Sequence, residues 1–355
     1  MKNKKIVIAG GTGFIGQALA RYFGKDNQIV IISRQSVNGH NNNYSNKLLL
    51  PAQGYNITYR RWDGEHLEKH WTSELEAADM VINLAGKSVN CQYTEKNKKA
   101  IMESRVLATN AIGAAIRNCI VPPRLWVNAG SATIYRNATD HPQDEYTGEI
   151  KDDFSVEVCK QWEATMQALP MPATRKIILR MAITLGNGGV MVPYFNLLKF
   201  GMGGRQGNGR QMYSWLHIED TCRIIEWVHE HGAMEGIYNC ASPNAVTNAF
   251  FMQTLRNTTA TRFALALPNW IITLGAWLIG TEKELLLKSR WVAPARLLQS
   301  GFLFKYPALP GALTEIVKNT DPRSYHFVRK SNVQPEKNGA CCTTAQQYDI
   351  TGNAI

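Results

Sequence analysis

A glycine-rich loop near the start of the chain has the residue types and spacing that can hold the phosphates of a dinucleotide. The loop reads Gly10-Gly11-Thr12-Gly13-Phe14-Ile15-Gly16. Its first glycine allows a tight turn, the next leaves room for the phosphates, and the last lets the following helix pack on the preceding strand. Because the loop follows a β-branched run and opens a helical pattern, it predicts a nicotinamide dinucleotide site. The predicted contacts are Gly10, Thr12, Gly13, Phe14, Ile15 and Gly16.

Two residues at the end of the next apolar run bear on the choice between NAD and NADP. NAD-binding proteins place an acid there to accept from the ribose hydroxyls, whereas this chain has Ser33 and Arg34. An arginine at that point can pair with a 2′-phosphate, although it can also stack on the adenine. The sequence therefore favours NADP over NAD. Asp63, further along, either accepts from the adenine amino group or caps a turn.

The elements that must position these residues alternate between strands and helices. The expected strands are 5–9, 28–33, 55–61, 79–84, 124–129, 176–185 and 236–240, and the expected helices are 14–23, 95–118, 155–168 and 220–230. Such alternation predicts an α/β fold, a Rossmann doubly wound parallel sheet with a smaller C-terminal α/β cap.

The character of the chain changes after Gly186. Residues 186–210 hold many glycines and suit loops around a ligand better than a regular core. Further helices are expected near Phe250 and over 270–280. The expected parts are a dinucleotide-binding domain over 1–186 to which 215–245 return, a smaller substrate-side domain over 187–330, and a disordered tail over 331–355.

Four longer stretches carry a family resemblance. They are Val81 to Gly86 (VINLAG), Glu103 to Val106 (ESRV), Gly201 to Asp220 and Ser289 to Tyr306. With them, the chain resembles the extended short-chain dehydrogenases/reductases, and more narrowly the NAD-dependent epimerase/dehydratase-like proteins with a C-terminal domain of unknown function. The resemblance spans nearly everything from residue 5 to about residue 318. It implies that Leu84, Ala85 and Gly86 line the cofactor and that Arg105 reaches toward it from its helix.

The same resemblance implies a Tyr-x-x-x-Lys pair on the helix after the fifth strand, and this chain departs from it. The tyrosine would be the general acid or base, and the lysine would hold the nicotinamide ribose and lower the tyrosine pKa. Lys160 matches the lysine, but Val156 stands in the place of the tyrosine and cannot transfer a proton. Ser131 matches the residue that holds the substrate oxygen, and Tyr135 either supplies the missing hydroxyl or packs under its loop. The expected catalytic residues are Ser131, Tyr135 and Lys160.

The substrate side is expected at the glycine-rich, cationic stretch Gly203–Gln211. Arg205 and Arg210 either bind a substrate phosphate, as the corresponding region does in related sugar-nucleotide enzymes, or are ordinary surface charges. Gln211 and Trp215 complete the predicted contacts. Trp215 adds apolar area that suits a carbonyl substrate, or it belongs to the core.

Charge and cysteine content narrow the expected partners. Lys and Arg number 39 against 28 Asp and Glu, but no long basic run appears, so we expect no nucleic-acid binding. Seven cysteines without a C-x-x-C pair favour neither a disulfide framework nor a metal site. Cys159 is interpreted as a buried structural thiol, because no histidine partner is evident. With no apolar run long enough for a bilayer and no signal peptide, we expect a cytoplasmic protein with no membrane partner, and a homodimer is allowed.

These residues predict an NADP-dependent oxidoreductase or epimerase-like enzyme that acts on a small carbonyl or alcohol substrate. Val156 keeps a second function open, a non-catalytic NADP-binding regulator, since some relatives are labelled as cell-division inhibitors. A sugar-nucleotide epimerase proper normally requires the tyrosine base, so Val156 argues against it.

Overall fold

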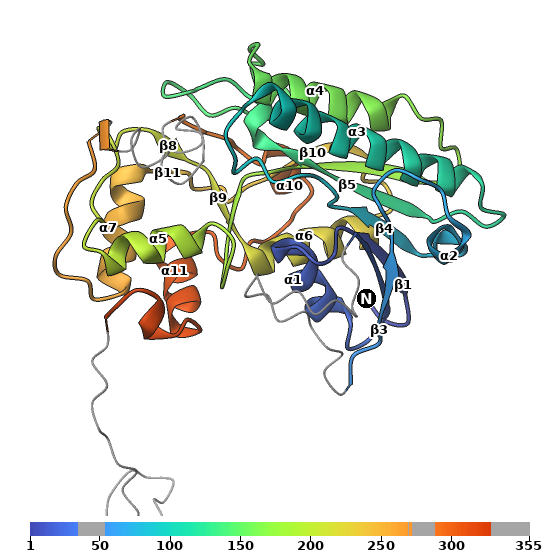
Figure 1. Ribbon diagram of the computed structural model, residues 1–355, viewed down its shortest axis with the longest axis horizontal. Helices are drawn as coiled ribbons and strands as arrows, with labels where there is room; N and C mark the ends of the chain where they lie inside the picture. The colour runs from blue at the N-terminus through green and yellow to red at the C-terminus, as the bar shows by residue number, and fades with distance from the viewer. Residues whose placement is uncertain (35–53, 269, 272–287, 328–355) are drawn as a thin grey trace, which may run out of the picture.

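A parallel sheet of seven strands forms the centre of the molecule (Figure 1). The computed structural model describes residues 1–34, 54–268, 270–271 and 288–327. The strand order is β10-β6-β5-β4-β1-β2-β3, and every neighbouring pair is parallel. The bounds are β1 Lys5–Ala9, β2 Gln28–Ser33, β3 Ile57–Arg61, β4 Met80–Asn83, β5 Leu125–Ser131, β6 Arg175–Met181 and β10 Gly236–Cys240. The predicted Rossmann-type α/β fold is confirmed.

Helices cover both faces of this sheet, because its strands are apolar on both sides. In β1, Ile6 and Ile8 join the core beneath one helical layer, whereas Val7 and Ala9 join the core beneath the other. Burial on both faces is typical of parallel sheets. The first layer holds α1 (Phe14–Phe23) and α6 (Ile218–Glu230), and the second holds α2 (Lys69–Thr72), α3 (Glu95–Arg117) and α4 (Phe154–Gln167) (Figure 1).

A smaller core lies beside the sheet and is built mainly from later parts of the chain (Figure 1). Its helices are α5 (Met191–Lys199), α7 (Asn248–Thr258) and α11 (Leu309–Lys318). Two short ladders accompany them. In these, β8 (Met212–Tyr213) runs antiparallel to β11 (Val246–Thr247), and β7 (Ile183–Leu185) runs parallel to β9 (Trp215–His217).

Helix α5 corrects one expectation from the sequence. Residues 186–210 were expected to form loops rather than core, yet α5 occupies 191–199 and buries Tyr194 and Phe195 against Phe251 and Tyr325. The glycines that flank this helix hide its apolar pattern in the sequence.

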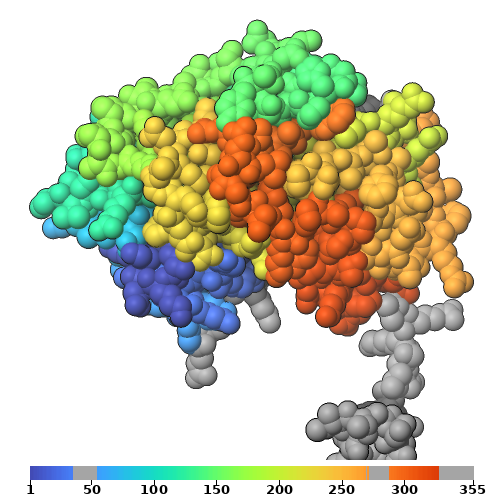
Figure 2. Space-filling view, turned by 180° about the vertical axis from the view of Figure 1, so that it is seen from behind, coloured from blue at the N-terminus to red at the C-terminus, as the bar shows by residue number. Residues whose placement is uncertain are grey.

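A segment that precedes α11 in the chain returns to the large sheet. Helix α10 (Ala295–Gln299) packs on β10, and Leu297 and Phe302 join the core beneath α1 and α6. Trp227 in α6 donates its indole N–H to the Ser300 hydroxyl over 3.1 Å. Figure 2 shows residues near 300 lying against residues near 230 on the rear face. The expected division, in which only 215–245 return, therefore omits this segment.

The expected elements of the large sheet and its helices agree with the observed ones to within about two residues at each end. The exception is the strand expected over 176–185, which divides at Ala182, where the N–H donates to the Cys240 carbonyl. Most of the helix expected over 270–280 and the whole expected tail, 331–355, lie outside the described residues.

Candidate functional site

The carboxyl ends of the parallel strands bring the predicted site residues to one edge of the sheet. Gly10 follows β1, Ser33 ends β2, Leu84 follows β4 and Ser131 ends β5. These four strands are neighbours in the order β5-β4-β1-β2. In open α/β sheets the ligand binds outside this edge.

The glycine loop has the geometry that its sequence predicts. Gly10 has a φ of 73°, and a Cβ there would lie 2.9 Å from the carbonyl carbon of Leu84, so only glycine fits. A Cβ on Gly16 would lie 2.5 Å from the Gly11 Cα, so this glycine lets helix and turn approach closely. A Cβ on Gly13 would meet nothing nearer than the Gly10 carbonyl oxygen at 3.5 Å. The loop therefore leaves open the position at which a phosphate approaches.

The start of α1 is free to receive an anion. Gly13 is its N-cap and provides no side-chain hydrogen bond to the first turn. Unsatisfied N–H groups at a helix start favour a phosphate. The Phe14 ring packs on the other side of this loop, where a Cβ on Gly189 would lie 2.9 Å from it.

The end of β2 carries no acid. The Ser33 and Thr12 hydroxyls are 2.9 Å apart, which joins the end of β2 to the glycine loop. Arg34 is exposed at the same edge. The end of β2 thus has an exposed arginine and hydroxyl groups but no acid, which are the features from which NADP is predicted.

Asp63 caps the turn that follows β3. Its Oδ1 accepts from the N–H groups of Glu65 and His66, each over 2.9 Å, and its Oδ2 lies 2.6 Å from His66 Nδ1. These bonds lower the pKa of Asp63 to about 2. The turn cap is therefore observed, and the contact of Asp63 with adenine stays a prediction because its carboxylate is 48% exposed.

The segment after β4 is clamped by side chains. Asn83 Oδ1 accepts from the Ala85 N–H over 3.0 Å. Further on, the Lys87 N–H donates to Ser104 Oγ over 2.8 Å, and Arg105 Nη1 donates to the Lys87 carbonyl over 3.1 Å. Leu84, Ala85 and Gly86 are thereby held at the edge where the cofactor is expected. Arg105 reaches the backbone of this segment, and its approach to the cofactor stays a prediction.

Two hydroxyl groups meet just beyond β5. Ser131 Oγ donates to Thr133 Oγ1 over 2.9 Å, and the Thr133 N–H donates back to Ser131 Oγ over 3.2 Å. Both residues are partly exposed. The turn that holds them is the short helix η2 (Ala132–Ile134), for which Ser131 is the N-cap. Ser131 is therefore at the predicted edge, and Thr133 shares its site.

Tyr135 is not available for proton transfer, so its predicted catalytic role is wrong. It is only 1% exposed. Its hydroxyl accepts from Arg180 Nη1 over 2.7 Å and donates to Asn239 Oδ1 over 3.0 Å. Arg180 is in turn paired with Glu163 through two hydrogen bonds of 2.9 and 2.8 Å. Burial raises the pKa of Tyr135. The residue anchors η2 on β6 and β10.

Lys160 is partly exposed, and the prediction that it holds the nicotinamide ribose stays a prediction. Its side chain is 45% exposed, and its Nζ lies 3.4 Å from Asp152 and 3.7 Å from Glu157. Val156 is fully buried beneath η2 in the same cluster as Tyr135. The spacing from Val156 to Lys160 matches the family pattern.

Cys159 is buried as expected, and burial raises the pKa of its thiol to about 12. The nearby charge of Glu163 raises it further, against the effect of Arg105. A thiol with this pKa holds almost no thiolate near neutral pH. We expect iodoacetamide at pH 8 to leave Cys159 unmodified in the folded protein while it labels Cys91, which is partly exposed. Peptide mass spectrometry checks this, with urea-unfolded protein as the control. Rapid labelling of Cys159 in the folded protein would contradict the structural role.

Two of the predicted substrate residues, Trp215 and Gln211, are buried. Trp215 is fully buried and donates its indole N–H to the Asn244 carbonyl over 3.0 Å, so it belongs to the core. Gln211 is 8% exposed and donates to the Gln206 carbonyl over 3.0 Å. Both predicted substrate contacts are therefore wrong. Arg205 and Arg210 are exposed, and their role stays a prediction.

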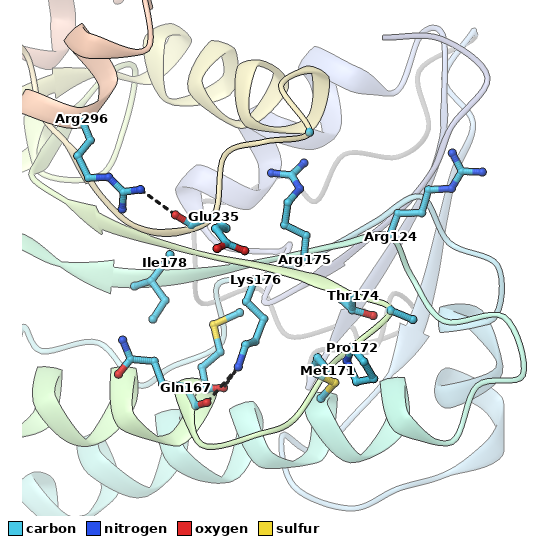
Figure 3. A pocket seen from close by; sticks show the side chains of 14 residues that line it. Arg124, Gln167, Met171, Pro172, Thr174, Arg175, Lys176, Ile178, Glu235 and Arg296 are labelled. Carbon is cyan, nitrogen blue, oxygen red and sulfur yellow. Dashed lines mark hydrogen bonds between the residues drawn. The ribbon is translucent and has the colours of Figure 1, made fainter.

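A cavity of about 720 Å³ lies at the opposite edge of the sheet, where β5, β6 and β10 begin. Figure 3 shows that Arg175 and Lys176, two of its cations, point to opposite sides of β6. Lys176 Nζ donates to three carbonyls at the end of α4, and Arg175 donates to the Val228 and Met234 carbonyls. These cations are occupied by backbone carbonyls of helix ends and loops. The cavity is separate from the candidate site because it lies at the other edge of the sheet.

Within the described ranges, no helix is long and apolar enough to cross a membrane. The same residues contain no group of three or more His, Cys, Asp or Glu side chains that could hold a metal ion.

Sequence reasoning did not identify Arg180, Glu163 or Asn239 as residues of this region, and it gave no role to Thr133, which stands near Ser131. Thr133 stands two residues after Ser131, and this close spacing of hydroxyls is the signal for a shared role. The buried pair of Arg180 and Glu163 had only a weak signal, a lone charge inside an apolar strand.

Family models match two parts of the chain. The NAD dependent epimerase/dehydratase family matches residues 6–157. A domain of unknown function, DUF1731, matches residues 267–316.

Relatives match almost the whole chain. An epimerase family protein of Staphylococcus saprophyticus is 30% identical over 316 residues, which is 88% of this chain and 99% of that protein. The human epimerase family protein SDR39U1 is 29% identical over 319 residues, with 88% and 99% covered. A crystal structure of human SDR39U1 with NADPH superposes with a TM-score of 0.75 and covers 89% of this chain and 99% of that one. A UDP-N-acetylglucosamine 4-epimerase from Methanobrevibacter ruminantium, 18% identical with a TM-score of 0.69, covers 90% and 98% and shares the fold.

Proposed function

The chain belongs to the NAD dependent epimerase/dehydratase family, and from that premise we propose that it binds NADP and acts as an oxidoreductase on a small carbonyl or alcohol substrate. The observation that carries the proposal is the joint placement of the glycine loop and the Ser131–Thr133 hydroxyls on one edge of the sheet. The first suits a dinucleotide, and the second suits a substrate oxygen. The relative SDR39U1, crystallised with NADPH, supports the choice of cofactor.

Several residues fit the cofactor. The open position at Gly13 and the uncapped start of α1 would receive the pyrophosphate. Thr12, Ser33 and Arg34 would hold the 2′-phosphate of the adenosine ribose. The clamped segment Leu84–Gly86 would line the middle of the cofactor. When bound, the nicotinamide supplies a hydride donor or acceptor.

The chain's own residues have three tasks in this reaction. The glycine loop would bind and orient the cofactor. The hydrogen bonds from Ser104 and Arg105 keep the segment after β4 in place. The Ser131–Thr133 hydroxyls orient the substrate oxygen. The buried group of Tyr135, Arg180 and Glu163 supports the turn that carries these hydroxyls.

NADPH oxidation measured against panels of aldehydes, ketones and sugar nucleotides tests the proposal. Turnover with any panel supports it. Tight NADPH binding without turnover of any of these compounds would contradict the proposal that the protein is an enzyme.

That outcome would favour the alternative, a non-catalytic NADP-binding regulator. The observation in its favour is that α4 has Val156 in place of the catalytic tyrosine, and that Tyr135, just after η2, is buried and cannot replace it. A regulator would change its association with a protein partner when NADPH binds. Size-exclusion chromatography of partner complexes with and without NADPH measures this.

Arg34 provides a test of cofactor choice. We expect Arg34→Ala to raise the dissociation constant of NADPH about 10- to 100-fold, because a charge-assisted bond to phosphate contributes about 1.5–3 kcal/mol. The dissociation constant of NADH should change less than about threefold on the same reasoning, since NADH has no 2′-phosphate. Calorimetric titration measures both. Arg117→Ala, an exposed arginine late in α3, is the matched control. An equal loss for the two cofactors would refute the assignment.

A further inference from the structure

The missing tyrosine leaves open which group gives a proton to the substrate oxygen. Val156 has no proton to give, and Tyr135 is held between Arg180 and Asn239. Cys159 is buried with a raised pKa. The remaining hydroxyls at the end of β5 belong to Ser131 and Thr133.

The hydrogen bonds of these two hydroxyls have a defined direction. Ser131 Oγ accepts from the Thr133 N–H over 3.2 Å, so its own proton is directed away from that bond. That proton is donated to Thr133 Oγ1 over 2.9 Å. Thr133 Oγ1 therefore accepts one bond and keeps its own proton to donate. Among the residues that the structure describes, no acceptor lies within hydrogen-bond distance of that proton.

We propose that Thr133 is the catalytic hydroxyl that contacts the substrate oxygen, and that Ser131 lies behind it as the second member of a proton relay. This inference rests on the proposed oxidoreductase function. The family pattern points to Ser131 as the direct contact, so the two assignments differ in the order of the groups.

The relay balances as follows for reduction of a carbonyl. When bound reduced nicotinamide supplies a hydride to the carbonyl carbon, one C–H bond would break and one would form, and the carbonyl oxygen would take the Thr133 proton. The Thr133 oxygen takes the Ser131 proton, and a water molecule gives a proton to Ser131 and leaves as hydroxide. Three O–H bonds break and three form, and both side chains end in their starting state.

The turn that carries Thr133 has little freedom to move. The residue lies in η2, and two positions later Tyr135 is bonded to β6 and β10. A Cβ on Gly148 would lie 2.3 Å from the Tyr135 ring, so the backbone at Gly148 packs directly against that ring. Rigid support of this kind keeps a donor in position for a developing negative charge.

Two measurements on the full chain test the relay. The first is the dissociation constant of 4-nitrobenzamide, whose carbonyl accepts a hydrogen bond but resists reduction, with and without NADPH. We expect Thr133→Val to weaken its binding about tenfold and Ser131→Ala only about twofold, because only Thr133 touches the oxygen. Thr133→Ser should bind as wild type. Thr314→Val, the same change on an exposed part of α11, is the control.

The second measurement is reduction of 4-nitrobenzaldehyde by NADPH in mixtures of H2O and D2O. We expect Thr133→Val and Ser131→Ala each to lower kcat about 100-fold or more, and Thr133→Ser to restore most of it. A curved dependence of the wild-type rate on the deuterium fraction would indicate two protons in flight. A linear dependence, or loss of activity in Ser131→Ala alone, would overturn the relay.

The two measurements distinguish a failure of the Thr133 contact from a failure of the proposed oxidoreductase function. Amide binding that depends on Thr133, with no turnover of the aldehyde, contradicts the oxidoreductase and supports the Thr133 contact. Amide binding that is absent, or equal in wild type and Thr133→Val, overturns the contact itself.

Discussion

Gly13→Asp is expected to weaken NADPH binding by at least about a hundredfold while the chain stays folded. The new carboxylate would stand where the pyrophosphate approaches, at the open start of α1. Two like charges a few ångströms apart cost about 3 kcal/mol or more near a protein surface, and about 1.4 kcal/mol is a factor of ten in affinity. The fold should tolerate the change, because a Cβ at Gly13 meets nothing closer than 3.5 Å.

Calorimetric titration with NADPH and a thermal unfolding curve measure the two effects separately. Gly232→Asp is the matched control, because that glycine is equally open and lies away from the cofactor edge. The same affinity for NADPH in both variants would show that the glycine loop does not hold the phosphates. A large loss of melting temperature in Gly13→Asp alone would show that this glycine is needed for the fold.

Glu163→Ala is expected to lower the free energy of unfolding by about 3–5 kcal/mol. Glu163 and Arg180 are 7% and 9% exposed, and their two hydrogen bonds are the neutralising contact of a buried guanidinium. Without the carboxylate, Arg180 keeps its charge in a site that water scarcely reaches. The loss would extend to Tyr135, whose hydroxyl depends on Arg180.

Urea unfolding followed by tryptophan fluorescence measures this effect. The control is Glu157→Ala on the same helix, where the carboxylate is 47% exposed and lies 3.7 Å from Lys160. That variant should lose less than about 1 kcal/mol, since exposed ion pairs contribute little. The double variant Glu163→Leu with Arg180→Met should recover most of the stability, because apolar residues can replace a buried pair. A loss below about 1 kcal/mol for Glu163→Ala would disprove this account.

The features that the sequence predicts correctly are those set by local backbone geometry. Gly10 needs its positive φ, and Gly16 needs its missing side chain, within a single strand-turn-helix unit. Ser131 is also set by local geometry, because it ends β5 and caps the turn that follows directly. Such requirements appear as residue types at short spacing, so a single sequence is enough to read them.

The residues that sequence reasoning misplaced depend on distant parts of the chain. Tyr135 is withdrawn from the site by Arg180 and Asn239, which lie 45 and 104 residues further along. Trp215 is buried with Phe251 in the smaller core. Whether a helical residue such as Lys160 faces the site likewise depends on how the whole helix packs. Periodicity and motif spacing alone contain none of this information.

The return of α10 to the large sheet also bears on synthesis of the chain. The last strand of the large sheet ends at Cys240, but Leu297 and Phe302, which complete the core beneath α1 and α6, come roughly 60 residues later. At about 5–20 residues per second, a ribosome adds them about 3–12 s after β10. Until then an apolar area beside the edge strand is uncovered, and the nascent chain is open to chaperones and to aggregation. Cutting the gene before residue 295 would make that temporary exposure permanent, so the C-terminal part is a late-arriving piece of the cofactor domain as well as a cap.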